Sequence, residues 1–499
     1  MFDNKDNTNE DNNLHPEFDF SSFKINEEDL KADAEKQQKA FEPVDHNDIL
    51  KLLLDQIQPV NFPEYLGIAQ EVLEEKLYIV ASIEKILETA KNNAWALCKK
   101  NNSIYVYNSA YWKLLDRDEL KAFLGKAAEK MGVFKYDARF YKFRDSLYKQ
   151  FMAFAHLTNP EPRKNTTFIN LQNGTFEITP ERQILRPPKP ADFLTYQLQF
   201  DFASEAKAPK FFQYLNQVLP DIKMQQILSE YIGYIFTTGS VLKLEKTLLL
   251  YGPGANGKSV FFEVINSLLG PENISNFSLQ NLTDSNGYYR AMLGNKLLNY
   301  ASEINGNLEA STFKQLVSGE PIEARLPYCP PIILREYAKL MFNCNLLPKA
   351  AEQTFAFFRR FLIIPFNVKI PEDQQDTQLA QKIIDSELPG IFNWVLEGLH
   401  RLLLQKNFTE SEAVNEQLHS YKVESDSVQL FLLEEGYIKS VEARLPLKEL
   451  YQKYKSFCIE SSYHPCSSRT MSERLKNAGF KVERISLYNV VYITKESKF

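Results

Sequence analysis

The chain has 499 residues, of which 44% are hydrophobic, and it carries a net charge of −6. This length predicts two to four domains with hydrophobic cores, and no apolar run reaches the roughly 18 residues that a membrane-spanning helix needs. The polar first residues, Met1 to Lys5, do not resemble a signal peptide. The five cysteines are scattered, with no Cys-x-x-Cys pair, which argues against a structural zinc site. We therefore expect a cytoplasmic protein of a bacterial or host cytosol, with no membrane partner.

The charge is unevenly distributed along the chain. Residues 1–47 contain 13 Asp and Glu residues against 5 Lys and Arg residues, so the rest of the chain has a net charge of +2. The last 75 residues alone carry +3. The overall acidity therefore does not exclude a nucleic-acid partner, but any contact with DNA has to be local, on loops or on one face.

The N-terminal part of the chain divides into three predicted segments. Residues 1–48 are rich in Asp, Asn, Glu and Lys, and they predict a disordered acidic arm. Apolar residues at helical spacing predict a helical segment over 49–92. Residues 93–204 predict an accessory α+β domain with two β-hairpins, one turning at Asn108–Ser109 and the other at Asn173–Gly174.

A Pro-rich linker is expected at Arg186–Pro190. The stretch from 205 to 410 that follows has the alternation of strands and helices that is typical of an α/β domain. Helices over 208–240 come first, and a helix near 390–404 closes the stretch. Between them, apolar strands alternate with helices. The strands are expected at Thr247–Tyr251, Leu297–Ala301, Leu340–Phe342 and Phe361–Ile364.

Residues 411–499 predict a linker and a separate small unit. Three helices followed by a β-hairpin predict a winged helix, a relative of the helix-turn-helix. Such a unit binds either DNA or another protein, and the sequence leaves both open. The helices are expected near 427–434, 447–460 and 468–478, and the strands at 480–485 and 488–493.

The most informative motif follows the strand Thr247–Tyr251. It reads Gly252-Pro253-Gly254-Ala255-Asn256-Gly257-Lys258-Ser259, and a helical pattern begins with Val260. This is the G-x-x-x-x-G-K-S spacing of a loop that binds nucleoside triphosphates. The glycines let backbone N–H groups approach the phosphates, and the helix adds its positive dipole end. We predict that Gly252 to Val260 bind ATP, with Lys258 on the β- and γ-phosphates and Ser259 on Mg²⁺. The alternative is an ordinary glycine turn.

Two polar residues follow later strands of the same stretch. Glu303 comes after Leu297–Ala301, where a carboxylate can orient the attacking water and help to hold Mg²⁺. Asn345 comes after Leu340–Phe342, where an amide can sense the γ-phosphate. The alternatives are a solvated loop glutamate and a turn asparagine before Pro348.

Arg359 and Arg360 precede the strand Phe361–Ile364. One of them is expected to act as an arginine finger on the nucleotide of a neighbouring subunit, and we favour Arg360. The alternative is a surface pair, or an ion pair with an acidic residue.

The stretch from Lys314 to Tyr328 predicts a loop and a hairpin that project from the sheet. Lys314 and Arg325 offer positive charge, and Tyr328 offers a ring on which a base can stack. We predict that these three residues contact DNA. Structural salt bridges are the alternative.

The order of these motifs resembles superfamily 3 helicases. The nucleotide loop is followed by Ala-Ser-Glu, Leu-Val-Ser-Gly-Glu-Pro-Ile-Glu-Ala-Arg, Phe-Asn-Cys-Asn-Leu-Leu-Pro and Phe-Phe-Arg-Arg-Phe. More narrowly, residues 95–495 are similar to the helicase part of phage and plasmid DNA primases and of the poxvirus primase-helicase. The resemblance implies a multidomain α/β protein with an AAA+-like P-loop NTPase core. It also implies a ring, expected to be a hexamer, with ATP between subunits and DNA in a central channel.

The sequence departs from that family in two respects. Proteins of that family usually carry a pair of acidic residues after the strand that corresponds to Leu297–Ala301. This chain has Ser302-Glu303 there, so Mg²⁺ is expected to rely more on Ser259. The primase module that such proteins often carry is not recognisable, because a polymerising site needs paired carboxylates. The upstream Asp-x-Asp, Asp116-Arg117-Asp118, is better explained by Asp116 capping a helix, with Glu119 as its partner.

These features predict an ATP-dependent replicative DNA helicase of a mobile element that acts on single-stranded or forked DNA. The resemblance implies that it moves 3′→5′. A separate primase or replication partner is an additional expectation. The rival is an origin-binding initiator in which ATP acts as a switch without unwinding. An unrelated P-loop kinase or GTPase would need an acceptor site or an Asn-Lys-x-Asp motif, and neither is present.

Overall fold

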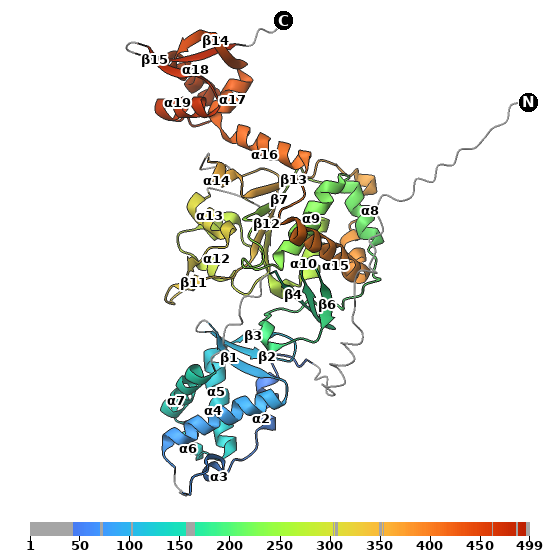
Figure 1. Cartoon of the computed structure of the whole chain (residues 1–499), viewed down its shortest axis with the longest axis vertical. Coiled ribbons are helices and arrows are strands. Elements are labelled where there is room, and N and C mark those ends of the chain that lie inside the picture. Colours follow the sequence, from blue (N-terminus) through green and yellow to red (C-terminus); the bar gives the residue numbers. More distant parts are fainter. Residues whose placement is uncertain are drawn as a thin grey trace, which may run out of the picture. The chain divides into compact units, whose positions relative to one another are not determined.

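The computed structural model describes most of the chain in two compact units (Figure 1). The first unit comprises the described residues up to Gln197 other than Asn165, with Asp201–Glu205, and the second comprises Leu198–Phe200 and the residues from Ala206 onward. Most of the predicted acidic arm lies outside the described residues, so that prediction stays open. The structure describes residues 43–69, 73–100, 103–155, 165–302, 304, 308–348, 352, 354–461, 463–485 and 488–495.

The first unit begins with helices packed on a small sheet. The expected helical segment 49–92 is divided into α2 (Ile49–Gln56), α3 (Phe62–Leu66) and α4 (Glu75–Asn92). An antiparallel sheet of β1 (Ala96–Lys100), β2 (Ser103–Tyr107) and β3 (Trp112–Leu115) follows, in that order. The first hairpin is confirmed, because Tyr107 pairs with Trp112 across its turn. The sequence reading missed β1.

Three helices complete the core of this part: α5 (Arg117–Met131), α6 (Lys135–Arg139) and α7 (Tyr141–Phe154). Asp116 caps α5 as expected, since its carboxylate accepts hydrogen bonds from the backbone N–H groups of Asp118 and Glu119 at 2.8 and 3.0 Å. A carboxylate with this role has no need of a metal.

The second hairpin is also confirmed, with a shifted turn. In β4 (Thr167–Leu171) and β5 (Gly174–Ile178), Leu171 pairs with Gly174, so the turn residues are Gln172 and Asn173 and not Asn173–Gly174. The prediction of a linker at Arg186–Pro190 is partly wrong, because a third strand, β6 (Gln183–Arg186), ends at its first residue.

The second unit contains a five-stranded parallel sheet in the order β13-β7-β12-β9-β8. The four expected strands are present, and β8 is a two-residue addition at the edge that the sequence did not reveal. The ranges are β7 (Thr247–Tyr251), β8 (Ile274–Ser275), β9 (Leu298–Ala301), β12 (Lys339–Cys344) and β13 (Phe361–Pro365). Buried apolar side chains on these strands, such as Leu249, Phe342 and Ile363, belong to one core.

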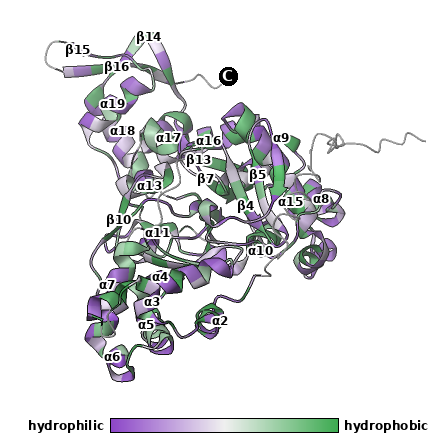
Figure 2. Ribbon diagram, turned by 60° about the horizontal axis from the view of Figure 1, so that its bottom comes forward, coloured by the Kyte–Doolittle hydropathy of each residue, from purple (hydrophilic) through white to green (hydrophobic). Residues whose placement is uncertain are grey.

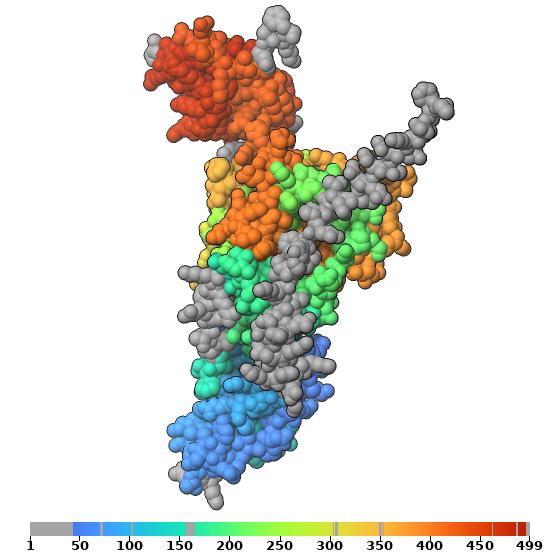
Figure 3. Space-filling model, turned by 45° about the vertical axis from the view of Figure 1, so that its right-hand side comes forward, coloured from blue at the N-terminus to red at the C-terminus, as the bar shows by residue number. Residues whose placement is uncertain are grey.

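Helices surround this sheet. The expected helical stretch 208–240 forms two helices, α8 (Pro209–Val218) and α9 (Ile222–Ile235). The closing helix α15 (Leu379–Gln405) starts at Leu379 and not near residue 390, so that Pro389 lies inside the helix. It packs along α9 and α8 (Figure 1 and Figure 3). The remaining helices of this part are α10 (Lys258–Leu269), α11 (Leu279–Thr283), α12 (Tyr288–Ala291), α13 (Ala310–Ser318) and α14 (Phe355–Phe358).

The C-terminal residues form a helical linker and a small α+β part. The helix α16 (Glu412–Ser425) packs on β13, and the hydroxyl of Tyr421 donates to the carbonyl of Pro348 at 2.7 Å. The expected helices are present, but the expected hairpin is a three-stranded sheet in the order β14-β16-β15, because β14 was missed. The elements are α17 (Ser427–Glu434), β14 (Tyr437–Pro446), α18 (Leu447–Glu460), α19 (Ser468–Asn477), β15 (Val482–Ile485) and β16 (Tyr488–Lys495).

None of the helices in the described residues is long and apolar enough to cross a lipid bilayer.

A buried carboxylate joins two of the helices around the sheet. Glu387 of α15 is almost fully buried, and its two oxygens accept the backbone N–H groups of Lys210 and Phe211 at 3.1 and 2.9 Å. It thereby caps the N-terminus of α8 from a position far away in the sequence. The negative charge also suits the positive end of the α8 dipole.

We predict that Glu387→Gln lowers the thermal stability of the protein. One oxygen is replaced by an NH₂ group, which leaves a buried backbone N–H without an acceptor at a cost of about 1–3 kcal/mol. The matched control is Asp385→Asn on the exposed face of the same helix. Thermal unfolding followed by circular dichroism should show a lower midpoint for Glu387→Gln alone. Equal midpoints would contradict the capping role.

Candidate functional site

The loop Gly252–Ser259 leads from the end of β7 into α10, as the sequence predicts. Gly257 has a φ of +83°, and a Cβ there would lie 2.7 Å from Val218 Cγ1 and 2.9 Å from Tyr214 Cε2. At Gly252, a Cβ would lie 2.3 Å from the carbonyl oxygen of Phe366. Both positions therefore need glycine for packing as well as for backbone conformation.

Hydrogen bonds from other segments hold this loop in place. The backbone N–H of Gly252 donates to the carbonyl of Cys344 at 3.1 Å, and that of Ile370 donates to the carbonyl of Ala255 at 2.9 Å. The side chain of Asn256 is buried and donates to the carbonyl of Phe366 at 2.8 Å. The loop is therefore fixed on both sides before any ligand arrives.

Lys258 is the first residue of α10, and its side chain folds back into the loop. Its Nζ donates to the carbonyls of Gly252 and Pro253 at 2.7 and 3.1 Å, and to Oδ1 of Asn256 at 2.9 Å. Burial lowers the pKa of Lys258, partly offset by Cys344. Among the described residues, no carboxylate forms an ion pair with it. The site thus holds a largely buried cationic group that only neutral oxygens satisfy.

The outer side of the loop is open. Pro253, Gly254 and Ala255 are exposed, and a Cβ on Gly254 would meet nothing within 4 Å. Ser259, one residue after Lys258, is also exposed in the first turn of α10. An anion could therefore reach the N–H groups at the start of a 12-residue helix, where the dipole favours negative charge.

The register of the parallel strands places Asn345 beside this loop. Cys344, the last residue of β12, pairs with Tyr251, the last residue of β7. Asn345 follows immediately and is exposed. It is therefore next to the start of the loop, where a polar sensor would be needed.

The sequence reading missed a second asparagine. Asn343 is buried in β12. Its Oδ1 accepts a hydrogen bond from the hydroxyl of Tyr300 at 2.8 Å, and its Nδ2 donates to the carbonyl of Lys258 at 3.4 Å. It links β9, β12 and the start of α10. The available signal was its position inside an apolar strand, where an amide needs specific partners.

Glu303 lies outside the described residues. Its predecessor Ser302 is exposed, directly after β9, and Ala301 pairs with Phe342 of β12. The predicted roles of Glu303 in water activation and Mg²⁺ binding therefore stay predictions.

Arg359 and Arg360 lie at the other end of the sheet from the loop. The backbone N–H of Thr247, the first residue of β7, donates to the carbonyl of Arg360 at 2.8 Å, whereas the loop follows the last residue of β7. A five-residue strand spans roughly 16 Å. Neither arginine therefore joins the loop of its own chain.

The two arginines differ in their surroundings. Arg360 has a side chain that is only 10% exposed, and it donates to Oγ of Ser318 at 2.9 Å and to the carbonyl of Ala356. Arg359 has a side chain that is 42% exposed, and it pairs with Glu245. The burial of Arg360 argues against our preference for it, and Arg359 is the more accessible of the two.

The predicted DNA-binding residues are only partly brought together. An antiparallel hairpin of β10 (Ile322–Ala324) and β11 (Ile332–Leu334) is present and is visible at the edge of the second unit (Figure 1). Arg325 and Tyr328 lie in its connecting loop, and Tyr328 is fully exposed. Lys314 is on α13 instead, with its Nζ 2.8 Å from a carboxylate oxygen of Glu352.

Arg325 lies beside an aromatic ring. Its guanidinium is 5.6 Å from the ring centroid of Tyr288 and donates to the hydroxyl of that residue at 3.2 Å. The hairpin loop therefore carries a positive charge beside the ring of Tyr288 from α12, and the same loop also carries the fully exposed ring of Tyr328.

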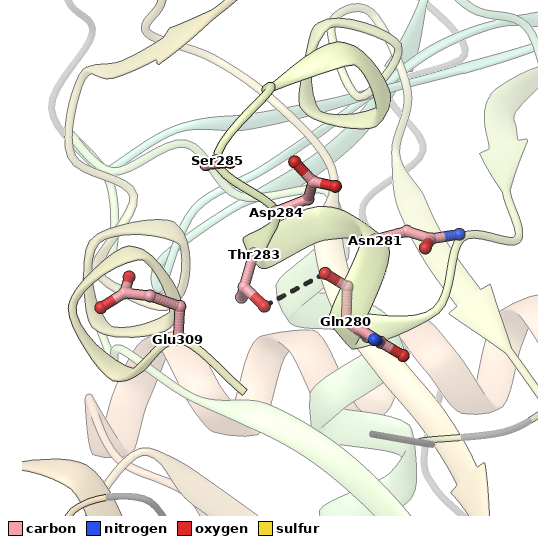
Figure 4. A pocket seen from close by; sticks show the side chains of 6 residues that line it. All are labelled: Gln280, Asn281, Thr283, Asp284, Ser285 and Glu309. Carbon is pink, nitrogen blue, oxygen red and sulfur yellow. Dashed lines mark hydrogen bonds between the residues drawn. The ribbon is translucent and has the colours of Figure 1, made fainter. Parts of the chain in front are cut away.

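A polar pocket near α11 and α13 is separate from the loop. It is lined by Gln280, Asn281, Thr283, Asp284, Ser285 and Glu309 (Figure 4). Glu309 caps α13, and hydrogen bonds from Thr312 and Ser311 lower its pKa to about 2. Its carboxylate is therefore engaged in helix capping, and this pocket includes none of the predicted site residues.

Comparisons with known proteins match two parts of the chain to protein families. Residues 84–220 match the family described as "D5 N terminal like", and residues 250–360 match a family of unknown function, DUF5906. Two viral proteins named "Putative helicase" are similar to this chain. The one from Acanthamoeba polyphaga mimivirus is 26% identical over 44% of the chain, and the one from Invertebrate iridescent virus 3 is 22% identical over 60%.

The chain resembles viral helicases of the primase-helicase type. The resemblance drawn from the sequence is confirmed at this level. The chain spans 24% of the mimivirus protein and 35% of the iridescent-virus protein. A solved structure, the C-terminal region of NrS-1, aligns with 82% of this chain and 98% of its own at 13% identity and a TM-score of 0.45.

We predict that Gly257→Ala destabilises the protein and that Gly254→Ala does not. The first substitution forces a side chain into a positive φ and against Tyr214 and Val218, at a cost of about 1–3 kcal/mol. The second adds a methyl group to open space. Thermal unfolding of both variants without ligand measures the difference. The same midpoint for both would contradict the packed position of Gly257.

Proposed function

We propose that this protein is an ATP-driven replicative DNA helicase of a mobile element, with an AAA+-like P-loop core of the superfamily 3 type. The observation that carries the proposal is Lys258. It is a buried cation without a carboxylate partner among the described residues, at the start of a helix and at the carboxyl end of a parallel strand. That is where folds of this kind place the phosphates of a nucleotide.

The residues present fit ATP and Mg²⁺. A phosphate oxygen can replace the carbonyl oxygens that now accept from Lys258, and it adds the negative charge that they lack. Ser259 would supply a hydroxyl to Mg²⁺, which neutralises charge on the phosphates. Glu303 would orient the attacking water, and Asn345 would hydrogen-bond the γ-phosphate.

A second copy of the chain would complete the site. The two arginines lie at the opposite end of the sheet from the loop, so either of them would reach the γ-phosphate only on the nucleotide of a neighbouring subunit. Arg359 fits this role better than Arg360, because its side chain is 42% exposed and that of Arg360 only 10%. This arrangement supports a closed ring, which we expect to be a hexamer, in which ATP binds between subunits.

DNA would contact the β10–β11 hairpin. Arg325 offers charge to a phosphate, and the exposed ring of Tyr328 offers a stacking surface for a base. Lys314 would contribute less to DNA binding, because Glu352 already pairs with its charge. The C-terminal part, with three helices and a three-stranded sheet, would be a winged helix that contacts duplex DNA or a replication partner such as a separate primase.

We predict that the protein separates a forked DNA with a 3′ single-stranded tail when ATP is present, and that Lys258→Ala abolishes both unwinding and ATP hydrolysis. The matched control is Lys223→Ala, an exposed lysine on α9. Strand release on a native gel measures unwinding, and phosphate release measures hydrolysis. A fork with only a 5′ tail should stay paired.

Other outcomes of that experiment separate the proposal from its rival. Hydrolysis that DNA stimulates without strand release, together with tight binding to one duplex sequence, would favour an origin-binding initiator. Full hydrolysis by Lys258→Ala would mean that the nucleotide site lies elsewhere.

We predict that Arg359→Ala loses ATP hydrolysis at least 100-fold, and that mixing it with Lys258→Ala restores part of the activity. In a mixed ring, an intact Lys258 from one subunit meets an intact Arg359 from its neighbour. Hydrolysis is measured on each variant alone and on mixtures that have been allowed to exchange subunits. No recovery in rings shown to be mixed would contradict the arrangement in trans.

A further inference from the structure

The first unit carries exposed aromatic side chains next to exposed lysines, outside every site described above. Phe134 and Tyr136 flank the start of α6, and Phe140 and Tyr141 lie at the start of α7. All four are between 50% and 70% exposed. Figure 2 shows hydrophilic and hydrophobic residues interleaved along this stretch. We call Phe134, Lys135, Tyr136, Phe140, Tyr141 and Lys142 the aromatic-basic surface.

The core of the unit does not use these rings. The buried faces of α6 and α7 are supplied by other side chains, namely Ala138, Phe143, Leu147 and Phe151. The exposed rings instead pair with each other, with centroids 5.5 Å apart for Phe134 and Tyr136 and 5.0 Å apart for Phe140 and Tyr141. Several large apolar side chains exposed in one short segment indicate a surface that binds something.

The charge of this region selects the kind of partner. From Arg117 to Phe154 the chain has nine Lys and Arg residues against five Asp and Glu residues, although the whole protein is acidic. Arg139 is paired with Glu129 at 2.8 Å. For Lys135 and Lys142, both exposed, the structure records no ion pair within the described residues. This segment therefore carries two exposed lysines and four exposed rings, together with one exposed carboxylate, Asp137; Lys135 also lies near enough to Glu129 to help lower its pKa.

We propose that the aromatic-basic surface binds single-stranded DNA, independently of the β10–β11 hairpin and of ATP. Rings accept unpaired bases by stacking, and lysines neutralise the phosphates between them. Duplex DNA hides the faces of its bases, so the rings select a single strand. The surface would hold the strand on the first unit, which extends the proposed function by a second contact with the same substrate class.

Two other occupants fit the charge less well. Protein interfaces are depleted in lysine, so a lysine-rich aromatic segment is unusual for a protein partner. A symmetric contact with a second copy would bring like charges together, which is unfavourable. Both remain distinguishable outcomes of the test.

The test is binding of the full-length protein to a fluorescent 20-nucleotide oligothymidine, measured by anisotropy with no nucleotide present. Tyr136→Ala combined with Tyr141→Ala should weaken binding at least tenfold, because stacking on each ring is lost. The matched control is Tyr65→Ala, an exposed ring of the same unit that lies near Glu84 and Glu88; the one lysine over its face, Lys85, is paired with Glu88 at 2.9 Å. It should change the affinity less than twofold.

Further measurements make the outcome decisive. Lys135→Glu combined with Lys142→Glu should also weaken binding and reduce its dependence on salt. The thermal midpoint and the size in solution should stay those of the parent protein. Unchanged affinity, an equal loss for blunt duplex of the same length, or a loss that follows failure to assemble would each overturn the proposal. Because no ATP is present, this result is separable from a failure of the ATPase test.

Discussion

The close packing of the Gly252–Ser259 loop against its neighbours is the constraint on which the rest of the candidate site depends. The loop touches three distant segments: α8 through Tyr214 and Val218, β12 through Cys344, and the residues after β13 through Phe366 and Ile370. Each contact is close enough to exclude a side chain or fix a backbone hydrogen bond. The start of α10 is therefore set by the whole unit, and with it the position of Lys258.

The packed loop encloses the ammonium group of Lys258. A desolvated ammonium group is unfavourable unless strong acceptors surround it, and burial accordingly lowers its pKa. The loop supplies three neutral oxygens and no carboxylate from the described residues. In the proposed function a phosphate would provide the missing negative charge, and its binding would relieve the penalty of burying the ammonium group. Asn343 and Tyr300 extend this polar environment into the sheet.

The parallel sheet separates the groups that the proposal assigns to one reaction. Its carboxyl edge carries the loop and Asn345, and its amino edge carries Arg359 and Arg360. Because a strand is rigid and roughly 16 Å long, only a second subunit can bring the two edges together. The proposed contacts with DNA likewise come from separate places, the hairpin of the second unit and the aromatic-basic surface of the first. The proposed function therefore divides one task between the two edges of the sheet, the two units and neighbouring copies of the chain.

The sequence by itself determined the strand, loop and helix around Lys258, the four longer strands of the sheet, the two hairpins of the first unit and the cap at Asp116, because local spacing and turn chemistry specify these features. It missed β1, β6, β8 and β14. β8 has only two residues and β14 is largely exposed, and both pair with strands further along the chain. β1 and β6 pair with their sequence neighbours β2 and β5, but the polar residues in them hide the strand pattern. Only the tertiary structure decided that Arg360 is buried while Arg359 is accessible, that Lys314 is held by Glu352, and that Asn343 contacts the loop. Burial and partner choice are set by residues far apart in the chain, and a local pattern contains no information on them.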